Sequence, residues 1–140
     1  MFYKCKHFQI SELVDKATYN KLGEQAWMLF NPTALIALDG IREYFGSAVY
    51  VNDWSSSGVF QFRGFRSMTC NTGATYSQHR FGNAFDCDVK GLSANSARKQ
   101  IVDDMDSPLL EFITCLESDV NWVHFDCRNI EERILMVKPY

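Results

Sequence analysis

Two short segments far apart in the chain, 84–90 and 122–128, share one alternating pattern of apolar and polar side chains. Successive side chains of a β-strand point to opposite faces, so this pattern predicts two strands that each bury one face. The residues expected on the buried faces are Phe85, Cys87 and Val89, and then Val123, Phe125 and Cys127. The residues expected on the open faces are Asp86 and Asp88, and then Trp122, His124, Asp126 and Arg128. If the two strands pair in an antiparallel sheet, an aspartate and a histidine lie side by side on its open face.

The other elements favour an α+β fold over a repeating βαβ arrangement. Capping residues predict helices that begin after Ser11, Asn31, Ser93 and Ser107, the first fading near Gly23 and the second ending at Gly46. The last of these helices is expected to carry Leu109, Phe112, Ile113 and Leu116 on one face. Strand-like runs occupy 48–51, 59–62, 85–89, 122–127 and 134–137. We therefore expect one domain over residues 1–140, with a small central antiparallel sheet flanked by helices.

Composition and charge exclude several classes of protein. The chain has 140 residues, of which 46% are hydrophobic, so it can bury a core. Its net charge is −3, with scattered basic residues, which argues against nucleic-acid binding. No apolar run reaches the roughly 18 residues that a membrane span needs, and we expect a soluble protein made in the cytoplasm without a signal peptide. Five cysteines without paired spacing are expected to be free, mostly buried thiols. The sequence leaves the oligomeric state open.

A histidine and an aspartate seven positions apart, His79 and Asp86, are candidate metal ligands. Seven extended steps span roughly 23 Å, so the chain must fold back between them if both bind one ion. Gly82 and Asn83 tolerate the left-handed conformations that such a reversal requires. With His124 from the other strand, the set has two histidines, one aspartate and an open fourth position, as in catalytic zinc sites. On spacing alone, an ordinary surface pair is an equally good interpretation of His79 and Asp86.

Longer motifs favour the metal interpretation. Residues 64–67 read Gly-Phe-Arg-Ser, residues 77–86 read Ser-x-His-x-x-Gly-x-Ala-x-Asp, and residues 122–126 read Trp-Val-His-x-Asp. From about Phe8 to Arg128, the chain resembles the family of zinc D-Ala-D-Ala carboxypeptidases and L-alanyl-D-glutamate peptidases, in particular its small phage-type members. The resemblance implies a hedgehog/DD-peptidase-like fold and a peptidase that binds Zn²⁺ and cuts the peptidoglycan stem peptide.

The same resemblance implies roles for individual residues. His79, Asp86 and His124 match the three zinc ligands. Arg66 matches an arginine that holds a substrate carboxylate or polarises the scissile carbonyl, which suits a guanidinium, although a surface ion pair is the alternative. Ser77 matches a hydroxyl near the metal that contacts substrate, although a helix or turn cap is nearly as good an interpretation.

Two further residues are expected near the ligands. Asp126 matches an aspartate that accepts a hydrogen bond from the last ligand and fixes its tautomer, although a plain ion pair with Arg128 is the alternative. Trp122 shares the open face with His124, so it is expected to line the substrate groove.

The general base is the point where the chain departs from the family pattern. The peptidases usually have Glu or Asp three residues before the last histidine, and Asn121 stands there instead. An amide cannot take a proton from water. Some relatives place a proton-handling residue five positions before the ligand, so Asp119 is the first candidate and Glu117 the next. The other open hypothesis is a catalytically impaired zinc-binding module that is structural or binds the cell wall.

The expected setting follows from the same resemblance. A small catalytic domain of this kind fits an enzyme that reaches the cell wall after release by a holin, or as part of a phage particle. A bacterial cytoplasmic or recycling enzyme is the alternative. Which stem-peptide bond is cut stays open.

Overall fold

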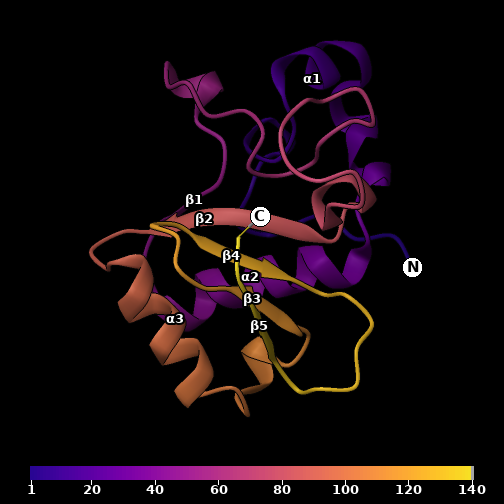
Figure 1. Cartoon of the computed structure of the whole chain (residues 1–140). Helices are drawn as coiled ribbons and strands as arrows, with labels where there is room; N and C mark the ends of the chain where they lie inside the picture. The colour runs from indigo at the N-terminus through magenta and orange to yellow at the C-terminus, as the bar shows by residue number, and fades with distance from the viewer. Residues whose placement is uncertain (140) are drawn as a thin grey trace.

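A computed structural model describes residues 1–139, which contain three α-helices and a five-stranded sheet (Figure 1). The helices are α1 (Lys16–Leu22), α2 (Pro32–Phe45) and α3 (Ala94–Asp103). The strands are β1 (Val49–Tyr50), β2 (Ala84–Val89), β3 (Cys115–Glu117), β4 (Val123–Asp126) and β5 (Leu135–Val137), in the sheet order β1-β2-β4-β3-β5. Short 3-10 turns are η1 (Ile10–Glu12), η2 (Gly23–Leu29), η3 (Trp54–Ser56), η4 (Gln78–Phe81) and η5 (Pro108–Leu110). The predicted α+β class is confirmed.

Two of the predicted helices begin where their caps indicated. The Asn31 side chain accepts a hydrogen bond from the backbone N–H of Thr33 at 3.0 Å, and α2 ends at Gly46 in the left-handed conformation. The Ser93 hydroxyl accepts from the backbone N–H of Ser96 at 3.1 Å and caps α3. The capping residues were sufficient to predict where α2 and α3 begin, because each cap satisfies a backbone N–H that the helix itself leaves unpaired.

The other two predicted helices differ from the structure. Ser11 caps no helix but lies inside the turn η1, and α1 begins later, where the carboxylate of Asp15 accepts from the backbone N–H of Thr18. After Ser107 the chain makes only the turn η5, and Leu116 lies in β3. An apolar run with three- and four-residue spacing does not by itself distinguish a helix from a buried strand. The η5 turn also approaches α2 closely, since a Cβ on Gly40 would lie 2.0 Å from the Leu109 carbonyl oxygen.

The sheet is mixed rather than antiparallel. The pairs β1–β2, β2–β4 and β4–β3 are antiparallel, whereas β3 and β5 run parallel. The predicted run 59–62 is not a strand. It belongs to a loop that returns to Asp53, and Phe60 and Phe62 are exposed.

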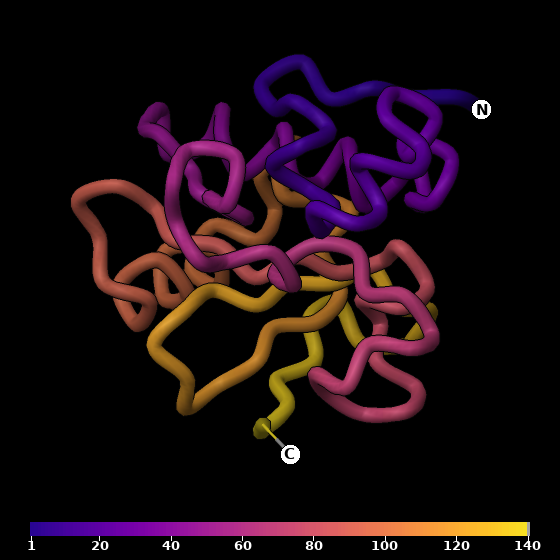
Figure 2. The backbone as a smooth tube through the Cα atoms, turned by 90° about the horizontal axis from the view of Figure 1, so that it is seen from above, coloured from indigo at the N-terminus to yellow at the C-terminus, as the bar shows by residue number. Residues whose placement is uncertain are grey.

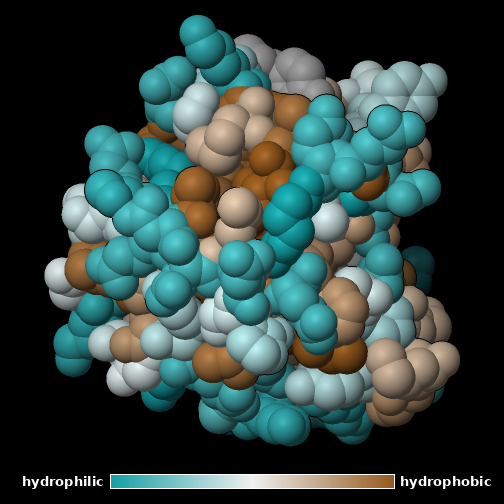
Figure 3. All heavy atoms as spheres, turned by 90° about the horizontal axis from the view of Figure 1, so that it is seen from below, coloured by the Kyte–Doolittle hydropathy of each residue, from teal (hydrophilic) through white to brown (hydrophobic). Residues whose placement is uncertain are grey.

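The core lies between the sheet and α2, which crosses behind the sheet in Figure 1. Phe85 and Phe125, opposite each other on β2 and β4, are completely buried there with Leu38 and Ile41 of α2. All five cysteines are free, and Cys87 is fully buried. On the face that Figure 3 shows, hydrophilic side chains cover most of the surface and hydrophobic ones gather in a hollow near its centre.

The other face of the sheet is covered by loops. Figure 2 shows the chain around residues 70–78 and its C-terminal part on the same side of the sheet. This is the face to which the polar side chains of β2 and β4 point. Within the described part of the chain, no helix has the length and apolar character needed to cross a bilayer.

Candidate metal centre

Two histidines and an aspartate meet on the face of the sheet that loops cover, the face that the sequence predicted to be open. In the pairing of β2 with β4, Asp86 lies directly opposite His124, as the alternating pattern predicted. His79 reaches the same place from η4. All three side chains are buried, and one candidate ligand atom from each lies within 4.8 Å of the others. This His-Asp-His cluster can hold a metal ion.

A tight reversal brings His79 back to β2. Gly82 has a φ of 68°, and its backbone N–H donates to the carbonyl of His79 at 3.3 Å. Ser77 caps the turn, since its hydroxyl accepts from the backbone N–H of His79 at 3.3 Å. The predicted reversal is confirmed, and Gly82 adopts the left-handed conformation that favours glycine, whereas Asn83 does not have a positive φ.

Replacing Gly82 by alanine is expected to destabilise the fold strongly. A Cβ there would lie 2.1 Å from the Leu29 carbonyl oxygen, in addition to the strain of a left-handed alanine. The expected loss in the free energy of unfolding is about 2–5 kcal/mol, measured by urea titration. Gly46→Ala is the matched control, because Gly46 has a similar φ of 61° and no described atom within 4 Å of the added Cβ. Equal losses in the two variants would contradict the predicted clash.

Each histidine is held through the ring nitrogen that faces away from the cluster. His79 donates from Nδ1 to the Gly64 carbonyl oxygen at 2.8 Å, and its Nε2 lies 3.3 Å from Oδ1 of Asp86. His124 donates from Nε2 to Oδ2 of Asp126 at 2.8 Å, and its Nδ1 lies 2.8 Å from the same Asp86 oxygen. Ligand histidines are typically oriented in this way, by a carbonyl or a carboxylate on the far side of the ring.

The facing atoms of His79 and Asp86 fit a cation between them. Burial lowers the pKa of His79, which keeps its imidazole neutral, and its one N–H is used by Gly64. The Nε2 lone pair therefore faces a carboxylate oxygen without a proton to share. Burial alone would raise the pKa of Asp86, but the hydrogen bond from Nδ1 of His124 opposes burial, and the pKa of Asp86 lies well below its usual range. Two imidazole nitrogens and one carboxylate suit a divalent metal ion once His124 has lost the proton on Nδ1.

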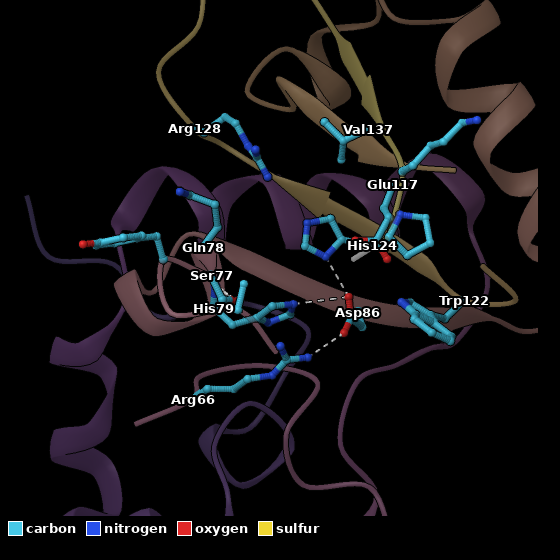
Figure 4. A pocket seen from close by; sticks show the side chains of 14 residues that line it. Arg66, Ser77, Gln78, His79, Asp86, Glu117, Trp122, His124, Arg128 and Val137 are labelled. Carbon is cyan, nitrogen blue, oxygen red and sulfur yellow. Dashed lines mark hydrogen bonds and ion pairs between the residues drawn. The ribbon is translucent and has the colours of Figure 1, made fainter. Parts of the chain in front are cut away.

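The second oxygen of Asp86 is bound by Arg66. The guanidinium Nη2 donates to Oδ2 of Asp86 at 3.1 Å, and Nε donates to the Phe62 carbonyl at 2.7 Å. The two contacts leave Oδ1 of Asp86 directed at the histidines and place the guanidinium at the edge of the cluster (Figure 4). Arg66 thus lies beside a candidate ligand and also lines the pocket described below.

Metal affinity is expected to rise with pH in the range where His124 titrates. Burial would lower the pKa of His124, but hydrogen bonds to Asp126 and Asp86 outweigh burial. They raise the pKa of the His124 imidazole to about 9 when no metal is bound. A metal ion must therefore displace a proton from His124 below that pH. We expect Zn²⁺ to bind about tenfold more tightly for each unit of pH between ~6 and ~8, measured by competition with a chelating dye. An affinity that does not change with pH would contradict this expectation.

A pocket of about 380 Å³ opens over the cluster. Arg66, Ser77, Glu117 and Trp122 line it together with the three candidate ligands (Figure 4). The prediction that Arg66, Ser77 and Trp122 lie near the candidate ligands is therefore confirmed. Asp126 is beneath His124 and fully buried, and both of its predicted contacts exist, one to His124 and one to Arg128.

The two candidate general bases lie in different places. Asp119, the first candidate, has a φ of 61° and lines another pocket, together with Asp88 and Asn121. Asp119 is absent from the lining of the pocket over the cluster, so the structure does not bring it to the candidate ligands. Glu117, the next candidate, belongs to β3 and extends into the cluster pocket. Of the two candidate bases, Glu117 is therefore the one whose carboxylate the fold brings to the candidate ligands.

Several other pocket residues were not predicted. Tyr76, Val137 and Lys138 line the pocket as well. The last two reach it because β5 runs parallel to β3, a pairing of which the sequence carries no local signal. Tyr76 directly precedes the Ser-x-His motif, and this proximity was the only available signal.

Comparison with protein-family models, with curated proteins and with solved structures finds no match to this chain. The assignment of a function therefore depends on the site itself.

Proposed function

We propose that this protein is a zinc-dependent peptidase that hydrolyses a peptide bond in the peptidoglycan stem. In this proposal it is a divergent member of the D-Ala-D-Ala carboxypeptidase and L-alanyl-D-glutamate peptidase family, with a hedgehog/DD-peptidase-like fold. The observation that carries the proposal is the oriented set of His79, Asp86 and His124 at the base of a pocket that also holds Arg66 and Glu117.

The three ligand residues would hold the metal through His79 Nε2, Asp86 Oδ1 and His124 Nδ1, since the other nitrogens and oxygen already have partners. When bound, Zn²⁺ supplies Lewis acidity that polarises a carbonyl and acidifies water. To serve as a ligand, His124 would give up the Nδ1 proton that it shares with Asp86. Asp126 continues to accept from Nε2 and keeps the ring in one tautomer.

Glu117 is the proposed general base. Its carboxylate takes the proton of the attacking water and returns it to the nitrogen of the leaving amine, so the peptide C–N bond breaks without a free anion. The support is its position, since it extends into the pocket from β3, beside the strand that carries His124. This role removes the difficulty that Asn121 raised, because the base need not come from position 121.

Arg66 and Trp122 are the proposed substrate contacts. The Arg66 guanidinium lies beside the cluster, where it can stabilise a substrate carboxylate or the oxyanion that develops at the scissile carbonyl. The indole Nε1 of Trp122 is buried and has no acceptor among residues 1–139. The indole ring lines the pocket, so the proposed contact with the substrate is made by the ring. Ser77 borders the same space and also caps η4.

The proposed setting is lysis or degradation of a bacterial cell wall by a phage-type enzyme. A holin would release it to the wall, or a phage particle would carry it. The proposal requires only that the stem peptide reaches the pocket, and it leaves open whether the cut bond is terminal or internal.

The test is digestion of purified peptidoglycan by the zinc-loaded protein, with released peptides identified by mass spectrometry. We expect new stem-peptide fragments or free D-alanine, and no release by zinc-free protein. Stoichiometric zinc without any released product would overturn the peptidase proposal. That result, combined with sedimentation of the protein with intact peptidoglycan, would instead favour a non-catalytic wall-binding module.

A further inference from the structure

A fully buried aspartate links one candidate metal ligand to an arginine. Asp126 has no exposed surface. Its Oδ2 accepts from His124 Nε2 at 2.8 Å and from Arg128 Nη2 at 2.6 Å. Its Oδ1 accepts from Arg128 Nε at 2.8 Å and from the Arg128 backbone N–H at 3.2 Å. All four bonds come from two residues, and only one of these is a candidate ligand.

This bonding pattern gives the carboxylate a single orientation. The guanidinium binds both oxygens at once, so rotation of the carboxylate would break two charge-assisted hydrogen bonds. The burial of Asp126 makes its charge dependent on these partners, because a buried carboxylate without them would be strongly destabilised. The oxygen that faces His124 is therefore positioned by Arg128.

The backbone that carries Arg128 is itself tied to the metal site. Thr114 holds the segment from the β3 side, since its hydroxyl donates to the Arg128 carbonyl at 2.7 Å and its N–H donates to the Asp126 carbonyl at 3.0 Å. Cys127 donates its N–H to the carbonyl of Asn83, in the reversal between His79 and Asp86. Arg128 is thus held on both sides by segments that carry or adjoin the site.

We propose that Arg128 is a positioning residue of the metal centre, which acts on His124 through Asp126. The Arg128 guanidinium fixes the Asp126 carboxylate, and this carboxylate binds Nε2 of His124. The orientation of the ring then directs Nδ1 of His124 toward the position of the ion. The inference rests on the proposed metal site and does not depend on peptidase activity.

An ordinary ion pair on the same sheet provides the comparison. Arg63 binds Asp88 of β2 at 2.9 Å, but the Asp88 side chain is half exposed and pairs with Arg63 rather than with a candidate ligand. If ion pairs on this sheet merely stabilised the fold, the loss of either arginine would leave the metal site unchanged. If Arg128 is a positioning residue, only the loss of Arg128 should change the affinity of the site for a metal ion.

The experiment compares Arg128→Met, Arg128→Lys and the control Arg63→Met with the wild type by Co²⁺ titration. We expect Arg128→Met to weaken Co²⁺ binding by about 10–100-fold and to change the visible absorption spectrum of the bound ion. Arg128→Lys keeps the charge but cannot bind both oxygens, so a smaller change is expected. Arg63→Met should match the wild type in both measurements.

A double-variant cycle tests whether the effect passes through Asp126. Asp126→Asn alone should weaken Co²⁺ binding in the same range, and adding Arg128→Met to it should change the affinity by less than about threefold. Wild-type affinity and spectrum in Arg128→Met, or fully additive effects in the double variant, would overturn the proposal. If Arg128→Met does not fold, as judged by circular dichroism, Arg128→Lys provides the same two readouts.

The outcomes separate this inference from the proposed function. A wild-type protein that binds no Co²⁺ overturns both the metal site and the role of Arg128. A protein that binds Co²⁺ normally but releases nothing from peptidoglycan overturns the peptidase proposal and leaves the Co²⁺ comparison valid.

Discussion

Glu117→Gln is expected to lower kcat for peptidoglycan hydrolysis by about 10²–10⁴-fold, while zinc stays bound at one equivalent. The amide has nearly the same shape as the carboxylate but cannot accept a proton from water. Glu117 is not among the candidate ligands, so the variant should keep its metal. Release of stem peptides over time measures the rate, and elemental analysis measures the zinc.

Asp119→Asn is the matched control for this variant. Asp119 is a carboxylate two residues further along the chain, but it lines a different pocket, so its loss should leave hydrolysis close to the wild-type rate. The reverse result, with activity lost in Asp119→Asn and kept in Glu117→Gln, would return the role of base to Asp119. It would also require the loop before β4 to adopt another conformation during catalysis.

His79→Ala is expected to lose stoichiometric zinc and to reduce hydrolysis to background. Removing the imidazole leaves Asp86 and His124 as the only candidate ligands of the cluster, and two ligands do not form a stable zinc site. Zinc is measured by elemental analysis after gel filtration, and hydrolysis by peptide release.

His7→Ala is the control for the loss of a histidine. His7 lies near the surface and pairs with Glu43 at 3.0 Å, away from the pocket, so the variant should keep both zinc and activity. Circular dichroism distinguishes a lost ligand from a lost fold in His79→Ala. Equal zinc in His79→Ala and the wild type would show that the ion binds elsewhere and that the motif was misread.

The parts of the site that follow from local chemistry could be predicted from the sequence. Alternation with period two placed Asp86 and His124 on the open faces of their strands, and the pairing of β2 with β4 then sets them opposite each other. The reversal at Gly82 could be predicted because few residues other than glycine adopt its left-handed conformation. Burial of Cys87 followed from the same alternation.

The parts that depend on long-range pairing could not be predicted in this way. Leu116 and Glu117 belong to a three-residue strand, which is too short for its period to be distinguished from that of a helix. The positive φ of Asp119, a non-glycine residue, left no signal in the sequence, and neither did the placement of Asp119 and Glu117 in different pockets. The parallel pairing of β5 with β3 required knowledge of the whole sheet.

That parallel pairing has a consequence for the order in which the pocket can form during synthesis. Val137 accepts a hydrogen bond from the N–H of Ser118, directly after Glu117, and lines the pocket opposite residues contributed much earlier in the chain. A nascent chain that has emerged only as far as Arg128 already contains the three candidate ligands and the Asp126–Arg128 pair but lacks this wall. The wall that β5 contributes is therefore the last part of the pocket to be synthesised.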